Sequence, residues 1–159
     1  VQQYLKKNWD GLGIVIVPAN GKNNIDRPVV AFRGLEIPTY FIFDADSSHT
    51  GAKREKTITS NAALQRLAGV EVIDFPNTII HDTWAVFHDK LETELKNATD
   101  GLFDSIREEI AEELGYAQPS SVLKNHEAAA RFIKSVYDKD KKITVLEEIV
   151  EKVTSLKGT

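Results

Sequence analysis

The stretch Phe41-Ile42-Phe43-Asp44-Ala45-Asp46 decides the fold, because three apolar residues run directly into two acidic ones. The apolar run over residues 39–43 predicts a buried strand, and the acidic pair marks its end. Two carboxylates one residue apart at a strand end can converge on one hard cation, since strand alternation no longer holds them on opposite faces. Mg²⁺ and Mn²⁺ prefer such oxygen ligands. The pattern therefore predicts a metal site at Asp44 and Asp46, and the alternative is a turn in which aspartate makes local hydrogen bonds.

Apolar runs and helical patterns alternate on both sides of this stretch. Residues 14–17, all apolar, predict an earlier strand buried on both faces, and residues 70–73 predict a later one. Helices are predicted over residues 26–33 and 60–68, with a polar loop over residues 49–57. This alternation predicts an α/β fold with a parallel sheet, whose site residues lie at the carboxyl ends of the strands.

The second half of the chain has a different character. Residues 1–7 suggest the end of a helix, and an extended piece over residues 78–87 leads into several segments with apolar residues at helical spacing. We expect two domains, an α/β core over residues 1–76 and a mainly helical extension over residues 77–159 that packs on it.

Composition limits the classes of function. The net charge of −4 weighs against a broad basic face for nucleic acid, so metal ions or other parts of the protein would have to neutralise phosphate. No apolar run approaches the ~20 residues of a membrane helix. The chain has no cysteine, which excludes disulfides and thiolate metal sites, and no methionine, so we expect a piece of a longer, cytoplasmic protein.

Further charged residues are candidates for the same chemistry. Lys22 follows Gly21 on the predicted rim and could hold a phosphate, although the P-loop spacing is absent. Lys53 and Arg54, in the predicted polar loop, are candidates for phosphate or DNA binding. Lys124 opens a predicted helix, where a cation opposes the helix dipole.

A third carboxylate and other side-chain types are further candidates or can be set aside. Glu92 is a candidate for a further metal-ligating carboxylate, and Glu94 is its near-equal rival. The four histidines show no metal-ligand spacing and favour packing or surface roles. Ser47 and Ser48 lack the elbow motif of a serine nucleophile.

Taken in order, these motifs resemble a known family. Gly21-Lys22 after one strand, the acidic pair after the next strand, and the following helix and strand are similar to the TOPRIM domain of topoisomerases, DnaG-type primases and OLD-family nucleases. Leu91-Glu92 and the helix opening at Lys124 look most like OLD-family ATP-dependent endonucleases. The TOPRIM resemblance covers residues 1–75, and the OLD-type resemblance extends to about residue 137.

The resemblance implies an endonuclease that hydrolyses DNA phosphodiesters with Mg²⁺ or Mn²⁺. Asp44 and Asp46 would bind metal and act in catalysis, and Glu92 would support a second ion. Lys22 would touch the phosphate or order the rim. Lys124 would stabilise the extra charge of the pentavalent phosphorane. An N-terminal ATPase domain of the same protein is an implied partner, and a homodimer is a further option.

One departure from the family leaves alternatives open. The family's first strand ends in a glutamate that acts beside the acidic pair, and we expect Val1 to follow just after that point. The alternatives are a non-catalytic α/β module for interaction or oligomerisation, and a haloacid-dehalogenase-like phosphatase with Asp44 as nucleophile. For the phosphatase, Ser47-Ser48 stands where a threonine and a hydrophobic residue are usual.

Overall fold

The computed structural model describes residues 5–156, which form two compact units. Of the described residues, the sheet unit comprises residues 5–91 and 145–156, and the helical unit comprises Glu92–Thr144. The domain boundary expected after residue 76 falls inside the sheet unit, because two of the strands that form the sheet come after it.

The sheet of the described residues has three strands in the order β1-β3-β2. β1 (Phe41–Asp44) runs parallel to β3 (Trp84–Phe87), and β2 (Ile79–Ile80) runs antiparallel to β3. The predicted α/β class is therefore confirmed, whereas the predicted parallel sheet is confirmed only for β1 and β3.

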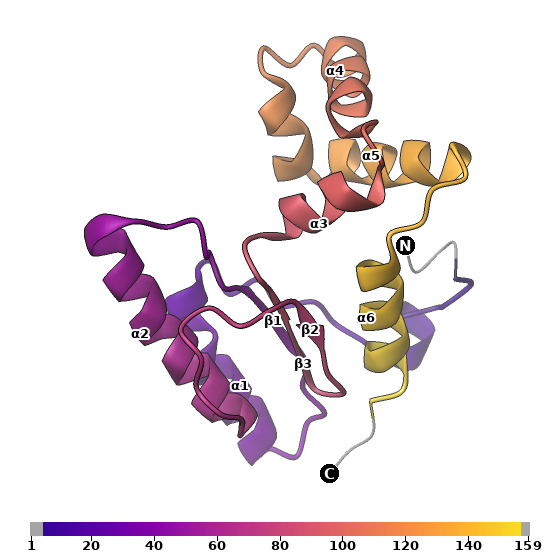
Figure 1. Ribbon diagram of the computed structural model, residues 1–159. Helices are drawn as coiled ribbons and strands as arrows, with labels where there is room; N and C mark the ends of the chain where they lie inside the picture. Colours follow the sequence, from indigo (N-terminus) through magenta and orange to yellow (C-terminus); the bar gives the residue numbers. More distant parts are fainter. Residues whose placement is uncertain (1–4, 157–159) are drawn as a thin grey trace. The chain divides into compact units, whose positions relative to one another are not determined.

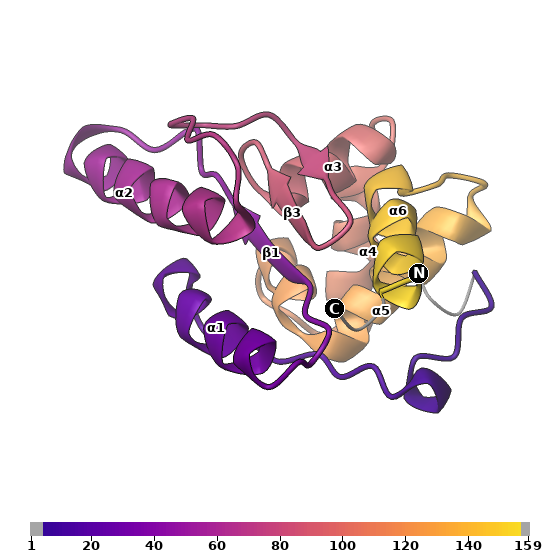
Figure 2. The same cartoon turned by 90° about the horizontal axis from the view of Figure 1, so that it is seen from below.

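The central strand β3 is buried on both faces. Because side chains alternate along a strand, Trp84 and Val86 join one apolar cluster and Ala85 and Phe87 join another. The first cluster includes residues of β1, α1 (Asp26–Gly34) and α2 (Gly51–Ala68), and the second includes residues of α6 (Thr144–Thr154). Figures 1 and 2 show α1 and α2 on one side of the sheet and α6 on the other.

The helix predicted over residues 26–33 is confirmed as α1, and the one over residues 60–68 is part of α2. The loop expected over residues 49–57 is wrong from Gly51 onward, because α2 begins there. The guanidinium of Arg54 lies 4.3 Å from the ring centroid of Phe75, which anchors this first part of the helix. Gly69 follows the end of α2 with φ at +74°, a conformation that favours glycine, and the predicted end of this helix at residue 68 is confirmed.

Two predicted strands do not form. Residues 14–17 lie outside the sheet, and Val15 and Ile16 are 80% and 75% exposed, so the apolar run that predicted burial on both faces faces solvent. Residues 70–73 are also outside the sheet, because the Gln65 side chain binds both the N–H and the carbonyl of Ile73 at 3.0 and 2.7 Å. Of the expected helix over residues 1–7, residues 1–4 lie outside the described part and residues 5–7 are not helical.

The helical unit confirms the predicted helical character of the second half. It contains most of α3 (Leu91–Ala98), all of α4 (Phe103–Leu114) and α5 (His126–Asp138), and the short 3-10 helix η3 (Pro119–Lys124). Phe103 of α4 and Phe132 of α5 meet edge to face with ring centroids 5.4 Å apart, in the core of this unit. No helix in the described part of the chain has both the length and the apolar character needed to cross a bilayer.

Candidate metal centre at the end of β1

The acidic pair stands where β1 ends and the chain continues beside the segment that follows β3. Asp44 is the last residue of β1, opposite Phe87 in the parallel register. The Ala45 N–H donates to the Phe87 carbonyl at 2.8 Å, and the Asp46 N–H donates to the Asp89 carbonyl at 2.9 Å. Asp46 has φ at +53°, so the chain turns at this residue, as the sequence predicted.

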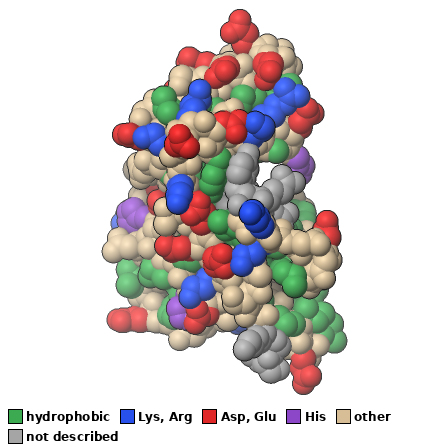
Figure 3. All heavy atoms as spheres, turned by 90° about the vertical axis from the view of Figure 1, so that its right-hand side faces the viewer, with side chains coloured by type: hydrophobic (Ala, Val, Ile, Leu, Met, Phe, Trp, Pro, Cys, Tyr) green, Lys and Arg blue, Asp and Glu red, His purple; other side chains and the backbone are tan. Residues whose placement is uncertain are grey.

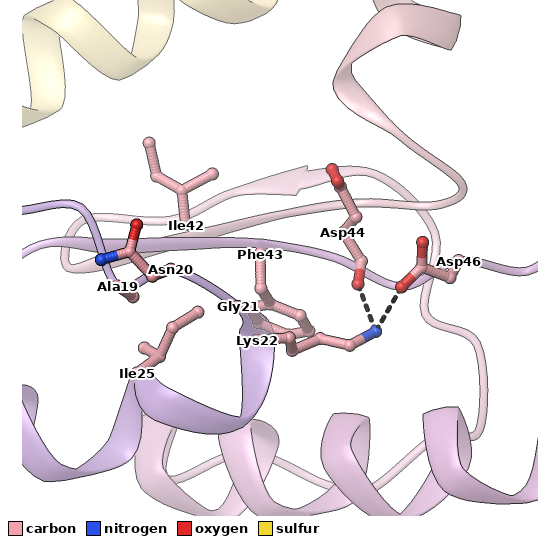
Figure 4. Close-up of a pocket in the computed structure, with 9 residues that line it drawn as sticks. All are labelled: Ala19, Asn20, Gly21, Lys22, Ile25, Ile42, Phe43, Asp44 and Asp46. Atoms are coloured by element: carbon pink, nitrogen blue, oxygen red, sulfur yellow. Dashed lines mark hydrogen bonds and ion pairs between the residues drawn. The ribbon is translucent and has the colours of Figure 1, made fainter. Parts of the chain in front are cut away.

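Lys22 reaches this turn from the short 3-10 helix η2 (Lys22–Asn24). Its Nζ donates to the Asp44 carbonyl oxygen at 2.7 Å, to Asp46 Oδ2 at 2.7 Å and to Asn61 Oδ1 at 3.0 Å. Figure 4 shows the lysine side chain extended toward the two aspartates. An ammonium group has three N–H donors, and each has an oxygen acceptor here. Lys22 therefore orders the rim, and contact with a phosphate would require it to give up one of these bonds.

The two carboxylates have different partners. Asp46 Oδ2 faces Lys22, while the Asp44 carboxylate is directed away from that lysine (Figure 4). Asp44 Oδ1 accepts a hydrogen bond of 3.1 Å from the Leu91 N–H, at the first residue of α3. A helix N-terminus favours a negative charge, so this contact holds the Asp44 side chain in place.

His49 lies on the other side of Asp46. Its Nε2 is 3.7 Å from Asp46 Oδ1, and its Nδ1 is 2.8 Å from Thr57 Oγ1 on α2. The Asp46 carboxylate thus stands between a lysine and a histidine, and all three side chains are less than one fifth exposed. The sequence assigned His49 a packing or surface role, and the structure gives it a place beside the acidic pair.

Asn61, on α2, is a residue of this site that the sequence analysis missed. Its Nδ2 donates to the Ala45 carbonyl at 2.9 Å and to the Asp74 carbonyl at 2.8 Å, while Oδ1 accepts from Lys22. The side chain is fully buried. Asn61 and Gln65 are four residues apart and share the buried face of α2. Two amide side chains at this spacing, on a helix face that also buries Leu64, are the signal that could have revealed them.

A cavity of about 330 Å³ opens beside the acidic pair. It is lined by both charged and apolar residues, all of which Figure 4 draws: Ala19, Asn20, Gly21, Lys22, Ile25, Ile42, Phe43, Asp44 and Asp46. Gly21 has φ at +128°, a conformation that glycine adopts without strain, so the turn before Lys22 can close around the cavity.

The donor set suits a hard cation that keeps part of its water shell. Mg²⁺ is commonly held by one or two carboxylates, with waters and substrate phosphate completing its coordination. Asp44 and Asp46 supply such oxygens. Within residues 5–156, no group of three or more histidine, cysteine, aspartate or glutamate side chains is arranged to hold a metal ion. The residues present therefore fit a partly hydrated ion rather than a closed protein cage.

The other predicted site residues lie on several elements. Lys53 and Arg54 are exposed in the first turns of α2, where the Arg54 guanidinium covers the Phe75 ring. Glu92 is exposed and follows Leu91 directly in the chain. Lys124 is exposed at the end of η3, just before Asn125 caps α5. Glu92 and Lys124 belong to the helical unit, whereas the acidic pair belongs to the sheet unit.

The charge distribution agrees with the composition. On the face drawn in Figure 3, lysine and arginine side chains are interspersed with aspartate and glutamate. A DNA-binding surface on that face would have to rely on a few placed cations rather than on a continuous basic stripe.

The fold and the site together define an α/β domain with paired carboxylates at the carboxyl end of a parallel strand. The family described as "Overcoming lysogenization defect protein-like, TOPRIM domain" matches residues 1–46, a segment that ends on Asp46. This match confirms the predicted resemblance and supports a TOPRIM domain of an OLD-family protein. No curated protein and no solved structure matches the chain.

Proposed function

We propose that this chain is the nuclease part of an OLD-family protein, and that it hydrolyses DNA phosphodiesters with Mg²⁺ or Mn²⁺ bound at Asp44 and Asp46. The observation that carries the proposal is the family match over residues 1–46, which includes β1 and both carboxylates. The cavity beside those carboxylates is large enough for several waters and a phosphate group.

Each proposed residue has a physical role. Asp44 and Asp46 would hold the cation, because carboxylate oxygens are the ligands that Mg²⁺ and Mn²⁺ prefer. When bound, the ion would polarise a phosphate oxygen and lower the pKa of a bound water. Lys22 fixes the orientation of Asp46 through the ion pair described above, and His49 lies beside the other carboxylate oxygen.

Residues outside the acidic pair complete the proposal. Lys53 and Arg54, exposed on α2, would contact the DNA backbone. Glu92 as a further metal ligand and Lys124 as the cation facing developing phosphorane charge are carried over from the family resemblance. The proposed partners are DNA and an ATPase domain of the same protein.

The test is nicking of supercoiled plasmid by the purified chain with Mg²⁺ or Mn²⁺, compared among three variants. Asp44→Asn and Asp46→Asn are expected to reduce metal-dependent nicking by at least about 100-fold, since each removes a charged ligand. Asp10→Asn, an exposed aspartate of the sheet unit, is the matched control and is expected to retain activity.

Metal binding is measured in parallel by Mn²⁺ electron paramagnetic resonance, which does not depend on turnover. The proposal requires the wild-type chain to bind Mn²⁺ and Asp44→Asn to bind it more weakly. Full nicking activity in both aspartate variants, or a wild-type chain that neither binds Mn²⁺ nor nicks plasmid, would rule it out.

A second candidate is an oligomerisation module. It is favoured by the exposed apolar run Val15-Ile16-Val17, whose three side chains are 80%, 75% and 54% exposed. An apolar run of this kind is a common feature of contact surfaces between protein chains. Light scattering of the wild-type chain and of Ile16→Glu tests it, because a dimer held by this run would dissociate in the variant.

A further inference from the structure

We infer that the ammonium group of Lys22 is a built-in substitute for a metal ion. It fills a cation position formed by three oxygens, so no divalent ion is needed at that position in the native domain. The binding of a separate divalent ion at the acidic pair rests on the proposed metal-dependent function, whereas the nature of the Lys22 position rests on geometry alone.

The three oxygens come from different chemical groups and different elements. They are the carbonyl oxygen of Asp44 on β1, the carboxylate Oδ2 of Asp46 after β1, and the amide Oδ1 of Asn61 on α2. A main-chain carbonyl, a carboxylate and a side-chain amide oxygen are all ligands that proteins use for hard divalent cations. The arrangement is therefore the ligand set of a cation site with an ammonium nitrogen at its centre.

Burial explains why this position must hold a positive charge. The side chains of Lys22 and Asp46 are 16% and 19% exposed, and Asn61 is fully buried. Oxygens gathered in such a place repel one another and have little water to replace a missing donor. The Lys22 ammonium group donates a hydrogen bond to each of the three oxygens, and these bonds link η2 to β1 and α2.

Distances indicate which ion would replace the ammonium group. The nitrogen-to-oxygen distances are 2.7, 2.7 and 3.0 Å. Calcium–oxygen distances of about 2.3–2.6 Å are closer to these than the magnesium–oxygen distances of about 2.0–2.1 Å. If the lysine is removed, the oxygens need to move only slightly to hold Ca²⁺, and further to hold Mg²⁺.

The consequence concerns the acidic pair. Lys22 binds Oδ2 of Asp46, so Oδ1, which faces His49, is the Asp46 oxygen best placed to bind a metal ion. The Asp44 carboxylate points away from the lysine (Figure 4). Two-metal nuclease sites place two ions about 3.5–4 Å apart. At the Lys22 position the chain itself supplies a single positive charge.

The experiment compares the wild-type chain with Lys22→Met and with Lys56→Met, an exposed lysine of α2. Thermal unfolding is followed by tryptophan fluorescence, because Trp9 and Trp84 are the two tryptophans and both lie in the sheet unit. Without divalent ions, Lys22→Met is expected to melt below the wild type, whereas Lys56→Met melts with it.

Added Ca²⁺ is expected to raise the melting temperature of Lys22→Met by about 3–5 °C more than that of the wild type, which corresponds to occupation at roughly ten times the dissociation constant. Mg²⁺ at the same concentration is expected to raise it less. Mn²⁺ titration followed by electron paramagnetic resonance is expected to show one more bound ion per chain in the variant than in the wild type.

Lys22→Gln is the second variant, because its amide keeps two donors for the oxygens and also offers an oxygen ligand. It is expected to bind the additional ion even if Lys22→Met does not fold. The inference is overturned if folded Lys22→Gln gains neither an ion nor stability from Ca²⁺. A wild-type chain that binds no divalent ion would instead contradict the proposed function, and the response of the Lys22 variants would still report on the cation position.

Discussion

The Nζ atom of Lys22 lies 2.7 Å from Oδ2 of Asp46, although 24 residues separate them in the chain. This ion pair joins the turn before α1 to the turn after β1. Both side chains are mostly buried, so salt screens the pair less than it screens an exposed one. The pair fixes the direction of the Asp46 carboxylate before any ligand is present.

Asn61→Leu is expected to destabilise the sheet unit by about 2–4 kcal/mol, because the carbonyls of Ala45 and Asp74 and the Lys22 ammonium group lose a buried partner. Urea unfolding followed by tryptophan fluorescence measures the change. Asn24→Ala is the matched control, since Asn24 is exposed and its amide makes a hydrogen bond to the Asn20 carbonyl. A loss no larger than that of the control would show that Asn61 does not support the rim.

Gln65→Met is expected to speed amide hydrogen exchange at Ile73, because the Gln65 side-chain oxygen accepts from that N–H at 3.0 Å. The substitution keeps a long side chain on the buried face of α2 but removes both hydrogen bonds to Ile73. Exchange mass spectrometry of the peptide that contains residues 70–74 provides the measurement. Unchanged exchange there would mean that other contacts protect this segment.

Tyr40→Phe is expected to reduce the loss of stability at alkaline pH. Burial raises the pKa of the Tyr40 hydroxyl, and Asp82 and Glu148 raise it further. The hydroxyl contacts the carbonyl oxygens of His81 and Trp84. Because the folded-state pKa is above the unfolded value of about 10, this group's contribution to stability is complete below that pH and declines above it.

The measurement is the free energy of unfolding of the wild type and of Tyr40→Phe on both sides of that pH. The wild type should lose more stability than the variant as the pH rises. Parallel curves would show that ionisation of Tyr40 does not limit stability.

Phe132→Ala is expected to destabilise the helical unit by about 3–5 kcal/mol, because it removes a fully buried ring that packs edge to face on Phe103. Far-ultraviolet circular dichroism during urea unfolding reports this loss. Phe132→Leu keeps most of the apolar volume and should lose less than half as much. Equal losses in the two variants would contradict a packing role for the ring.

Some elements could be predicted from the sequence because local signals specify them. The apolar run into the acidic pair predicted β1, and the helical patterns over residues 26–33 and 60–68 predicted α1 and the last part of α2. Each depends on residues that are neighbours in the chain. The same reasoning failed for residues 14–17 and 70–73, which are largely exposed and outside the sheet. An apolar run by itself specifies neither its burial nor a neighbouring strand, because both depend on how distant parts of the chain pack.

By itself, the sequence determined that two carboxylates stand at the end of an apolar strand, since both facts belong to six consecutive residues. Only the tertiary structure decided what surrounds them. Lys22 and Asn61 reach the acidic pair from separate elements, and no local pattern encodes that meeting. The reason is physical: buried oxygens must find donors wherever the folded chain brings them, and that choice is made by packing rather than by sequence proximity.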